Sequence, residues 1–150
     1  LIPDIIRAHK NNVQLDIRNP KAVRPWQHVL EPLFGYLTLA KKLYLNKSNY
    51  SGSWNFGPEK NDIKTVSEVI KIAKDEGMEL IYSNNNKNKF YESKFLSLDI
   101  SKAKKLLLWN PKWKSEMAIK KTIQWYIDFY NKKSVEQLME NDIKSYLKNE

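Results

Sequence analysis

The chain has 150 residues, 41% of them hydrophobic, and its 26 lysines and arginines against 17 aspartates and glutamates give a formal net charge of +9. This size suits one domain, or part of a larger protein, with enough apolar residues for a core. The absence of cysteine excludes disulfides and cysteine-ligated metals, and because no apolar run reaches transmembrane length and no signal peptide opens the chain, we expect a cytoplasmic protein.

The positive charge makes nucleic acid a partner to consider. The lysines are nevertheless spread along the chain, as at 41–42, 102–105 and 120–121, mostly on the predicted outer faces of helices. Solvated lysines explain such a distribution, so we expect no nucleic-acid partner and no membrane partner. A stand-alone helical domain that binds acidic polymers through its lysines stays open as an alternative.

The chain begins Leu1-Ile2-Pro3-Asp4, without Met, and enters a helix almost at once. Pro3 suits the first turn of a helix, where its missing N–H is not needed. We therefore expect a helix that ends at about residues 11–12 and a chain cut from a longer protein. Apolar and polar residues then alternate over 13–17, which predicts a strand with one buried face.

Residues 18–33 contain two arginines, three prolines, a tryptophan and a histidine. Neither a strand nor a helix interior tolerates so much proline, so this segment is predicted to be a shaped connection. Its arginines suit a phosphate, because the planar guanidinium donates two parallel hydrogen bonds. The alternative is a structural turn in which Arg24 forms an ion pair with an acidic residue such as Glu31 or Asp16.

Further along the chain, helices are expected over about 31–45, 65–76, 101–107, 115–131 and 135–147. Thr65 and Glu68 form a capping-box pattern, and Gly77 is a natural residue just beyond the end of that helix. Ser115 is expected to cap the helix over 115–131. Short strands are predicted over 53–58 and 78–82, and polar loops over 46–52 and 83–89.

The segment Arg24–Leu33 resembles the motif of the CDP-glucose 4,6-dehydratases, extended short-chain dehydrogenase/reductases that act on nucleotide sugars. Pro25 stands where related enzymes carry aspartate, and residues 18–20 precede it; both features favour the CDP-glucose branch. The resemblance continues in order through three further segments, 53–57, 98–111 and 124–126. In these segments, Trp54 stands where the family carries an aromatic residue, and Leu108 stands where it usually carries glycine.

This resemblance implies an α/β fold class, namely the helix-rich substrate-binding C-terminal lobe of an extended Rossmann-type enzyme, with short strands. Residues 1–150 would form this nucleotide-sugar-binding lobe, and residues 131–150 its helical tail. None of the four glycines falls in a Gly-x-Gly-x-x-Gly pattern, and no tyrosine is followed four residues later by lysine. We therefore expect the chain alone to lack NAD binding and catalysis, both of which the family places in an absent N-terminal half.

For the full-length protein, the resemblance implies a lyase that converts CDP-glucose to CDP-4-dehydro-6-deoxyglucose and water with bound NAD. Such an enzyme would serve deoxysugar and glycan biosynthesis, and family members are usually homodimers. A related epimerase, or a dehydratase that uses another nucleotide, stays open because base choice depends on a few contacts.

The resemblance assigns no catalytic residue to this chain and implies seven substrate-binding residues: Arg24, Arg18, Ile17, Leu15, Leu1, Val66 and Tyr91. Arg24 corresponds to the arginine that contacts the diphosphate, and Arg18 is a phosphate or ribose candidate. Leu15 and Ile17 lie on the strand that borders the base pocket.

Three further candidates come from other segments. Leu1 is placed where the family offers backbone groups to the base, and Val66 where a small apolar residue covers the ribose or base. Tyr91 stands where related enzymes carry histidine, so its contact departs from the family pattern. His28 is expected to be a structural histidine, and two separated histidines without acidic partners at ligand spacing predict no metal site.

Overall fold

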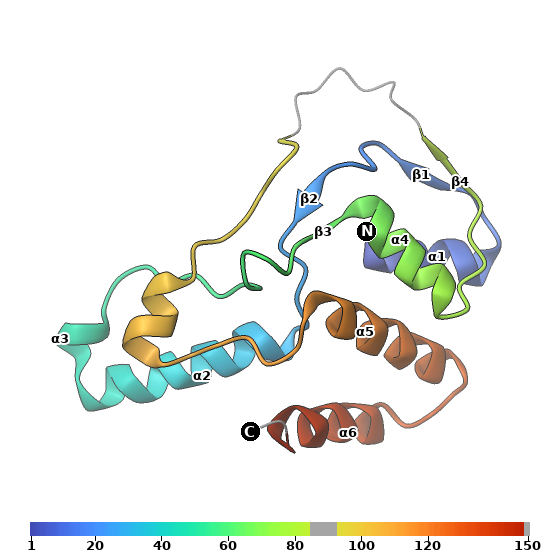
Figure 1. Cartoon of the computed structure of the whole chain (residues 1–150). Coiled ribbons are helices and arrows are strands. Elements are labelled where there is room, and N and C mark those ends of the chain that lie inside the picture. The colour runs from blue at the N-terminus through green and yellow to red at the C-terminus, as the bar shows by residue number, and fades with distance from the viewer. Residues whose placement is uncertain (85–92, 149–150) are drawn as a thin grey trace.

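The computed structural model describes residues 1–84 and 93–148 (Figure 1). It has a helix-rich α/β fold with a few short strands, as the sequence predicts. The elements follow in the order α1 (Ile2–Asn11), β1 (Leu15–Ile17), β2 (Val23–Arg24), α2 (Leu30–Leu45), α3 (Lys47–Tyr50), β3 (Lys64–Thr65), α4 (Val66–Asp75), β4 (Tyr82–Asn84), the π-helical segment η1 (Ala103–Leu107), α5 (Ser115–Tyr130) and α6 (Val135–Lys148). Among these described helices, none is long and apolar enough to cross a membrane.

The strands form two separate pairs. β1 runs parallel to β4, with Asp16 opposite Ser83, and β2 runs antiparallel to β3, with Val23 opposite Thr65. Leu15 and Ile17 are buried while Asp16 is exposed, which confirms the predicted strand with one buried face. These short pairs fix where the chain leaves β1 and where α4 begins.

The larger core joins α1, β1, α4 and α5, which gather on one side of the molecule in Figure 1. Its buried side chains come from these helices, from alternate residues of β1 and from Met78 just beyond α4: Ile5, Ile6, Ala8, Leu15, Ile17, Val69, Ile70, Ile72, Ala73, Met78, Ile119 and Ile123. The predicted ends of α4 are also confirmed. Thr65 and Glu68 form the capping box, and Gly77 adopts φ = 90°, a conformation that favours glycine.

A second core lies between α2 and η1, where Phe56, Ile100, Ala103, Leu107 and Trp109 are buried. The Phe56 ring lies directly against Gly35 of α2, and a Cβ at this glycine would overlap the ring. Glycine is therefore required here by close packing rather than by backbone conformation.

Glu31 connects three parts of the fold. Its carboxylate is fully buried and accepts hydrogen bonds from the backbone N–H groups of Lys112 (3.1 Å) and Trp113 (2.7 Å) and from the hydroxyl of Tyr146 (2.7 Å). A buried carboxylate is stable only when such donors replace its lost water. Glu31 thus links α2 to the start of α5 and to α6, and it is not the ion-pair partner of Arg24.

Two sequence predictions about short segments are wrong. Residues 47–50, expected in a loop, form α3, and the Trp54 ring stacks on Tyr50 while its Nε1 donates to the Tyr50 carbonyl (2.9 Å). Residues 53–58, expected to be a strand, pair with no strand within 1–84 and 93–148. The Phe56 carbonyl instead accepts a hydrogen bond from the Gln27 side chain (2.9 Å).

One predicted strand start and one predicted helix cap also differ. The strand expected over 78–82 begins at Tyr82, because its ladder is set by β1 and starts where the Leu15 N–H donates to the Ile81 carbonyl. Ser115 does not cap α5. Its own N–H donates to the Asp62 carboxylate (2.6 Å), so a side chain from a distant loop satisfies the helix start.

Candidate functional site

A cavity of about 250 Å³ lies where the ends of β1, β2, α1 and α4 meet. It is lined by nine residues: Leu1, Asp4, Asp16, Ile17, Arg18, Asn19, Arg24, Trp26 and Val66. Five of the seven residues that the sequence suggests as substrate contacts are among them, namely Leu1, Ile17, Arg18, Arg24 and Val66. The fold therefore gathers side chains from positions 1 to 66 of the sequence around one space.

The connection after β1 shapes this cavity. The Ala22 N–H donates to the Asn19 carbonyl (3.1 Å), and the N–H groups at the start of α4 donate back to the same connection, Val66 to the Ala22 carbonyl (2.9 Å) and Ser67 to the Pro20 carbonyl (2.9 Å). The start of α4 is thus fastened to this turn. That contact places Val66 beside the two arginines of the connection.

Arg24 lies on β2 and is half-buried. Its Nη1 donates to the Val23 carbonyl (2.8 Å) and to the Ser93 carbonyl (3.0 Å). These contacts orient the guanidinium through the backbone. Trp26 is fixed in a similar way, since its Nε1 donates to the Lys64 carbonyl (3.0 Å).

The lining combines three kinds of side chain that suit a nucleotide sugar. Arg18 and Arg24 supply positive charge and forked donors for a phosphate group. Val66 supplies apolar surface for a ring and the Trp26 ring also lines the cavity, whereas the Ile17 side chain is only 4% exposed and packs in the larger core. An anionic ligand that carries a flat ring fits this combination better than a purely apolar ligand does.

The other two candidates lie elsewhere. Leu15 is only 6% exposed, packs in the larger core, and does not line the cavity. Tyr91 lies outside the described residues.

Four lining residues were not among the sequence-based candidates: Asp4, Asp16, Asn19 and Trp26. A sequence signal did exist for Asp16, because it alternates with two apolar residues and must therefore face away from the core. Asn19 and Trp26 lie within the connection that the sequence marks as unusual. Asp4 is brought in by the start of α1, which only the fold could show.

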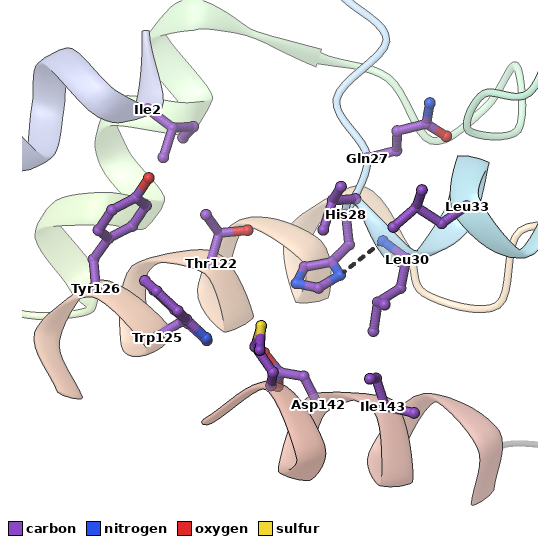
Figure 2. A pocket seen from close by; sticks show the side chains of 12 residues that line it. Ile2, Gln27, His28, Leu30, Leu33, Thr122, Trp125, Tyr126, Asp142 and Ile143 are labelled. Atoms are coloured by element: carbon purple, nitrogen blue, oxygen red, sulfur yellow. Dashed lines mark hydrogen bonds between the residues drawn. The ribbon is translucent and has the colours of Figure 1, made fainter. Parts of the chain in front are cut away.

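A second, larger cavity of about 580 Å³ lies between α5, α6 and residues 27–33 (Figure 2). Its lining is mostly apolar, with Trp125 and Met139 among its side chains, and none of its twelve lining residues is lysine or arginine. It therefore does not suit a diphosphate, and it contains none of the seven candidate contacts.

His28 borders this larger cavity, and its environment supports the expected structural role. It is 6% exposed, its Nδ1 accepts a hydrogen bond from the Leu30 N–H (3.3 Å), and its ring meets Trp113 edge to face, with centroids 4.9 Å apart. Burial lowers the pKa of His28 and thereby favours the neutral ring.

The described residues contain neither a Gly-x-Gly-x-x-Gly turn nor a cluster of metal ligands. The four glycines lie at least five positions apart in sequence, and Gly35 is covered by the Phe56 ring, so they do not form the closely spaced turn that approaches a pyrophosphate. Within 1–84 and 93–148, no group of three or more His, Asp or Glu side chains could hold a metal ion.

Comparison with known proteins shows relationships in both sequence and fold. The chain is 42% identical over 127 residues to a CDP-glucose 4,6-dehydratase of Salmonella typhimurium. The matched region covers 84% of this chain and 35% of that protein. The chain thus spans about a third of the length of this relative. No protein-family model matches the sequence.

Among solved structures, the fold is similar to a UDP-glucuronic acid 4-epimerase mutant from Bacillus cereus, crystallised with a fluorinated UDP-glucuronic acid and NAD. The TM-score is 0.70 at 18% identity, over 86% of this chain and 40% of that one. This likeness shows a shared fold, and the sequence relationship places the chain beside the nucleotide-sugar dehydratases.

Proposed function

We propose that this chain, a relative of the nucleotide-sugar dehydratases and epimerases, binds the nucleotide sugar in a 4,6-dehydratase that converts CDP-glucose to CDP-4-dehydro-6-deoxyglucose and water. NAD, which such an enzyme requires, is held in this proposal by residues outside the 150. The full-length enzyme is a cytoplasmic homodimer in the same proposal.

The observation that carries the proposal is the cavity around Arg24. Residues chosen as substrate contacts from separate sequence segments line one space, with two guanidinium groups beside apolar side chains. A diphosphate is bound by guanidinium groups, and a nucleobase or ribose packs against apolar side chains. The 42% identity to a CDP-glucose 4,6-dehydratase favours CDP-glucose as the particular substrate.

Two other functions are weighed against this one. A related epimerase, or a dehydratase for another nucleotide, would use the same cavity, and the epimerase fold likeness is compatible with it. A stand-alone domain that binds acidic polymers through its +9 charge would show strongly salt-dependent polymer affinity and no affinity for nucleotide sugars.

The experiment that tests the proposal uses the full-length protein that contains this chain, loaded with NAD. Calorimetric titration with CDP-glucose, UDP-glucose and dTDP-glucose is followed by product analysis by mass spectrometry. Selective binding of CDP-glucose and loss of one water from the sugar are expected. Binding of UDP-glucose with interconversion of C4 epimers supports the epimerase, and failure to bind any nucleotide sugar contradicts both.

A further inference from the structure

We propose that the 580 Å³ cavity between α5, α6 and residues 27–33 is a second ligand site, which binds an uncharged aromatic ring that carries a hydroxyl group. Phenol is the simplest such molecule. The site shares no lining residue with the Arg24 cavity, so the inference does not rest on the proposed function.

The size and the walls of this cavity suit a small aromatic molecule. Its volume falls within the range of about 300–1,000 Å³ that is common for small-molecule pockets. Trp125 supplies an aromatic wall, and its ring stacks on Phe129 at a centroid distance of 5.4 Å. Met139 and Ile143 of α6 are 49% and 46% exposed and also line the cavity, so it is open beside α6.

His28 directs an unused hydrogen-bond donor into this mostly apolar space. Its Nδ1 accepts the Leu30 N–H, so the proton of the neutral ring lies on Nε2. Figure 2 shows Nε2 on the side of the ring that faces Thr122 and Trp125. Within 1–84 and 93–148 this nitrogen has no hydrogen-bond partner, although His28 is only 6% exposed. A ligand that brings an acceptor to this donor satisfies it.

Asp142 and Thr122 restrict which group brings this acceptor. The Asp142 carboxylate lines the same cavity, and its Oδ1 lies 3.5 Å from Nζ of Lys121. The Thr122 hydroxyl donates to the Ala118 carbonyl (2.8 Å), so its oxygen is left as an acceptor. Asp142 repels an anion, and an ammonium group offers no acceptor to His28. A hydroxyl group both accepts and donates, so it suits this set of polar groups.

The test titrates phenol and benzene into the NAD-loaded full-length protein and follows binding by ligand-observed NMR. In a cavity without a free donor, the hydroxyl would lose its water without compensation, and phenol would bind more weakly than benzene. The hydrogen bond from His28 reverses this order, so phenol is expected to bind about threefold or more tightly than benzene. Phenol that binds no more tightly than benzene, or that does not bind at all, overturns the proposal.

Three variants locate the site. Met139→Trp adds a large ring to the lining and is expected to abolish the binding of both probes. The matched control is Met117→Trp on α5, since Met117 is also 49% exposed but lines none of the described cavities. Probe affinity that is unchanged in Met139→Trp overturns the site, whether or not the third variant folds. That third variant, His28→Leu, removes the donor, so phenol is expected to lose its advantage over benzene, and an advantage that persists in folded His28→Leu overturns the role of His28.

Discussion

The hydroxyl of Tyr146 lies 2.7 Å from Oε2 of Glu31 and donates a hydrogen bond to it, although the two residues are 115 positions apart in sequence. Tyr146 is 2% exposed and Glu31 is fully buried. This bond, together with the edge-to-face contact of Tyr146 with Trp113 at 5.1 Å, attaches α6 to the rest of the fold. The predicted helical tail is therefore an integral part of the structure rather than a loose appendage.

Replacing Tyr146 by phenylalanine removes this donor and keeps the ring. Because the Glu31 side chain is fully buried and loses one of its donors, loss of the bond is expected to reduce the free energy of unfolding by about 1.5–3 kcal/mol. Urea unfolding of the full-length protein measures the change. Tyr44→Phe is the control, since Tyr44 is 91% exposed and should alter stability little; equal effects of the two substitutions would contradict the role given to Tyr146.

The same pair predicts a pH dependence. Burial, followed by the hydrogen bond to Glu31, raises the pKa of Tyr146 well above its ordinary value of 10.0. The folded state then holds the phenol proton more tightly than the unfolded state, so this contribution is complete below pH 10 and is lost as the pH rises above it. The stability difference between wild type and Tyr146→Phe should therefore narrow above pH 10, and a difference that stays constant up to pH 11 would contradict the raised pKa.

Gly35→Ala tests the packing of α2 on the second core. Alanine usually stabilises a helix interior relative to glycine by about 1 kcal/mol. Here the added Cβ would overlap the Phe56 ring, and such overpacking is expected to destabilise the fold by about 1–3 kcal/mol. Thermal unfolding compared with Lys41→Ala on the exposed part of the same helix gives the measurement, and a stabilised Gly35→Ala protein would show that this contact is not tight.

The sequence was sufficient to predict the long elements because their signals are local. The stripe of α4, its capping box and Gly77 all act within a few residues of one another. The start of α5 at Ser115 was predicted, but the group that satisfies it was not, because its partner, Asp62, lies 53 positions away. The strand expected over 53–58 failed for the same kind of reason, since a strand requires a partner that its own sequence does not specify.

The residues of the candidate site also differ in whether a local sequence signal or only the fold identifies them. Arg24, with its neighbouring prolines and Trp26, is conspicuous within one short segment, but that segment was predicted as a connection, whereas Arg24 lies on the short strand β2 and α2 already begins at Leu30. Asp4 and Asp16 gain their place only when α1 and β1 are brought together around the cavity. Their surroundings, not their sequence neighbours, make them candidates.

The exposed side of α2 leads to a prediction about association. Leu37 and Leu45 are 70% and 69% exposed, and Val29, Leu33 and Tyr36 are at least 45% exposed. Apolar residues gathered in this way usually mark a contact surface, which we assign to the cofactor-binding part of the proposed enzyme. The isolated 150-residue chain is therefore expected to associate in sedimentation velocity, and Leu37→Glu to reduce that association; a wild-type chain that stays monomeric and melts cooperatively at high temperature would contradict this assignment.

The central claim, that the Arg24 cavity binds the diphosphate of a nucleotide sugar, is tested most directly by titrating CDP-glucose into the full-length, NAD-loaded protein and its Arg24→Ala variant. Loss of a charge-assisted, forked contact is expected to weaken binding by about tenfold or more. The control Lys71→Ala removes an exposed positive charge on α4 and should leave affinity unchanged. Affinity that is equally strong in a folded Arg24→Ala protein would contradict the claim.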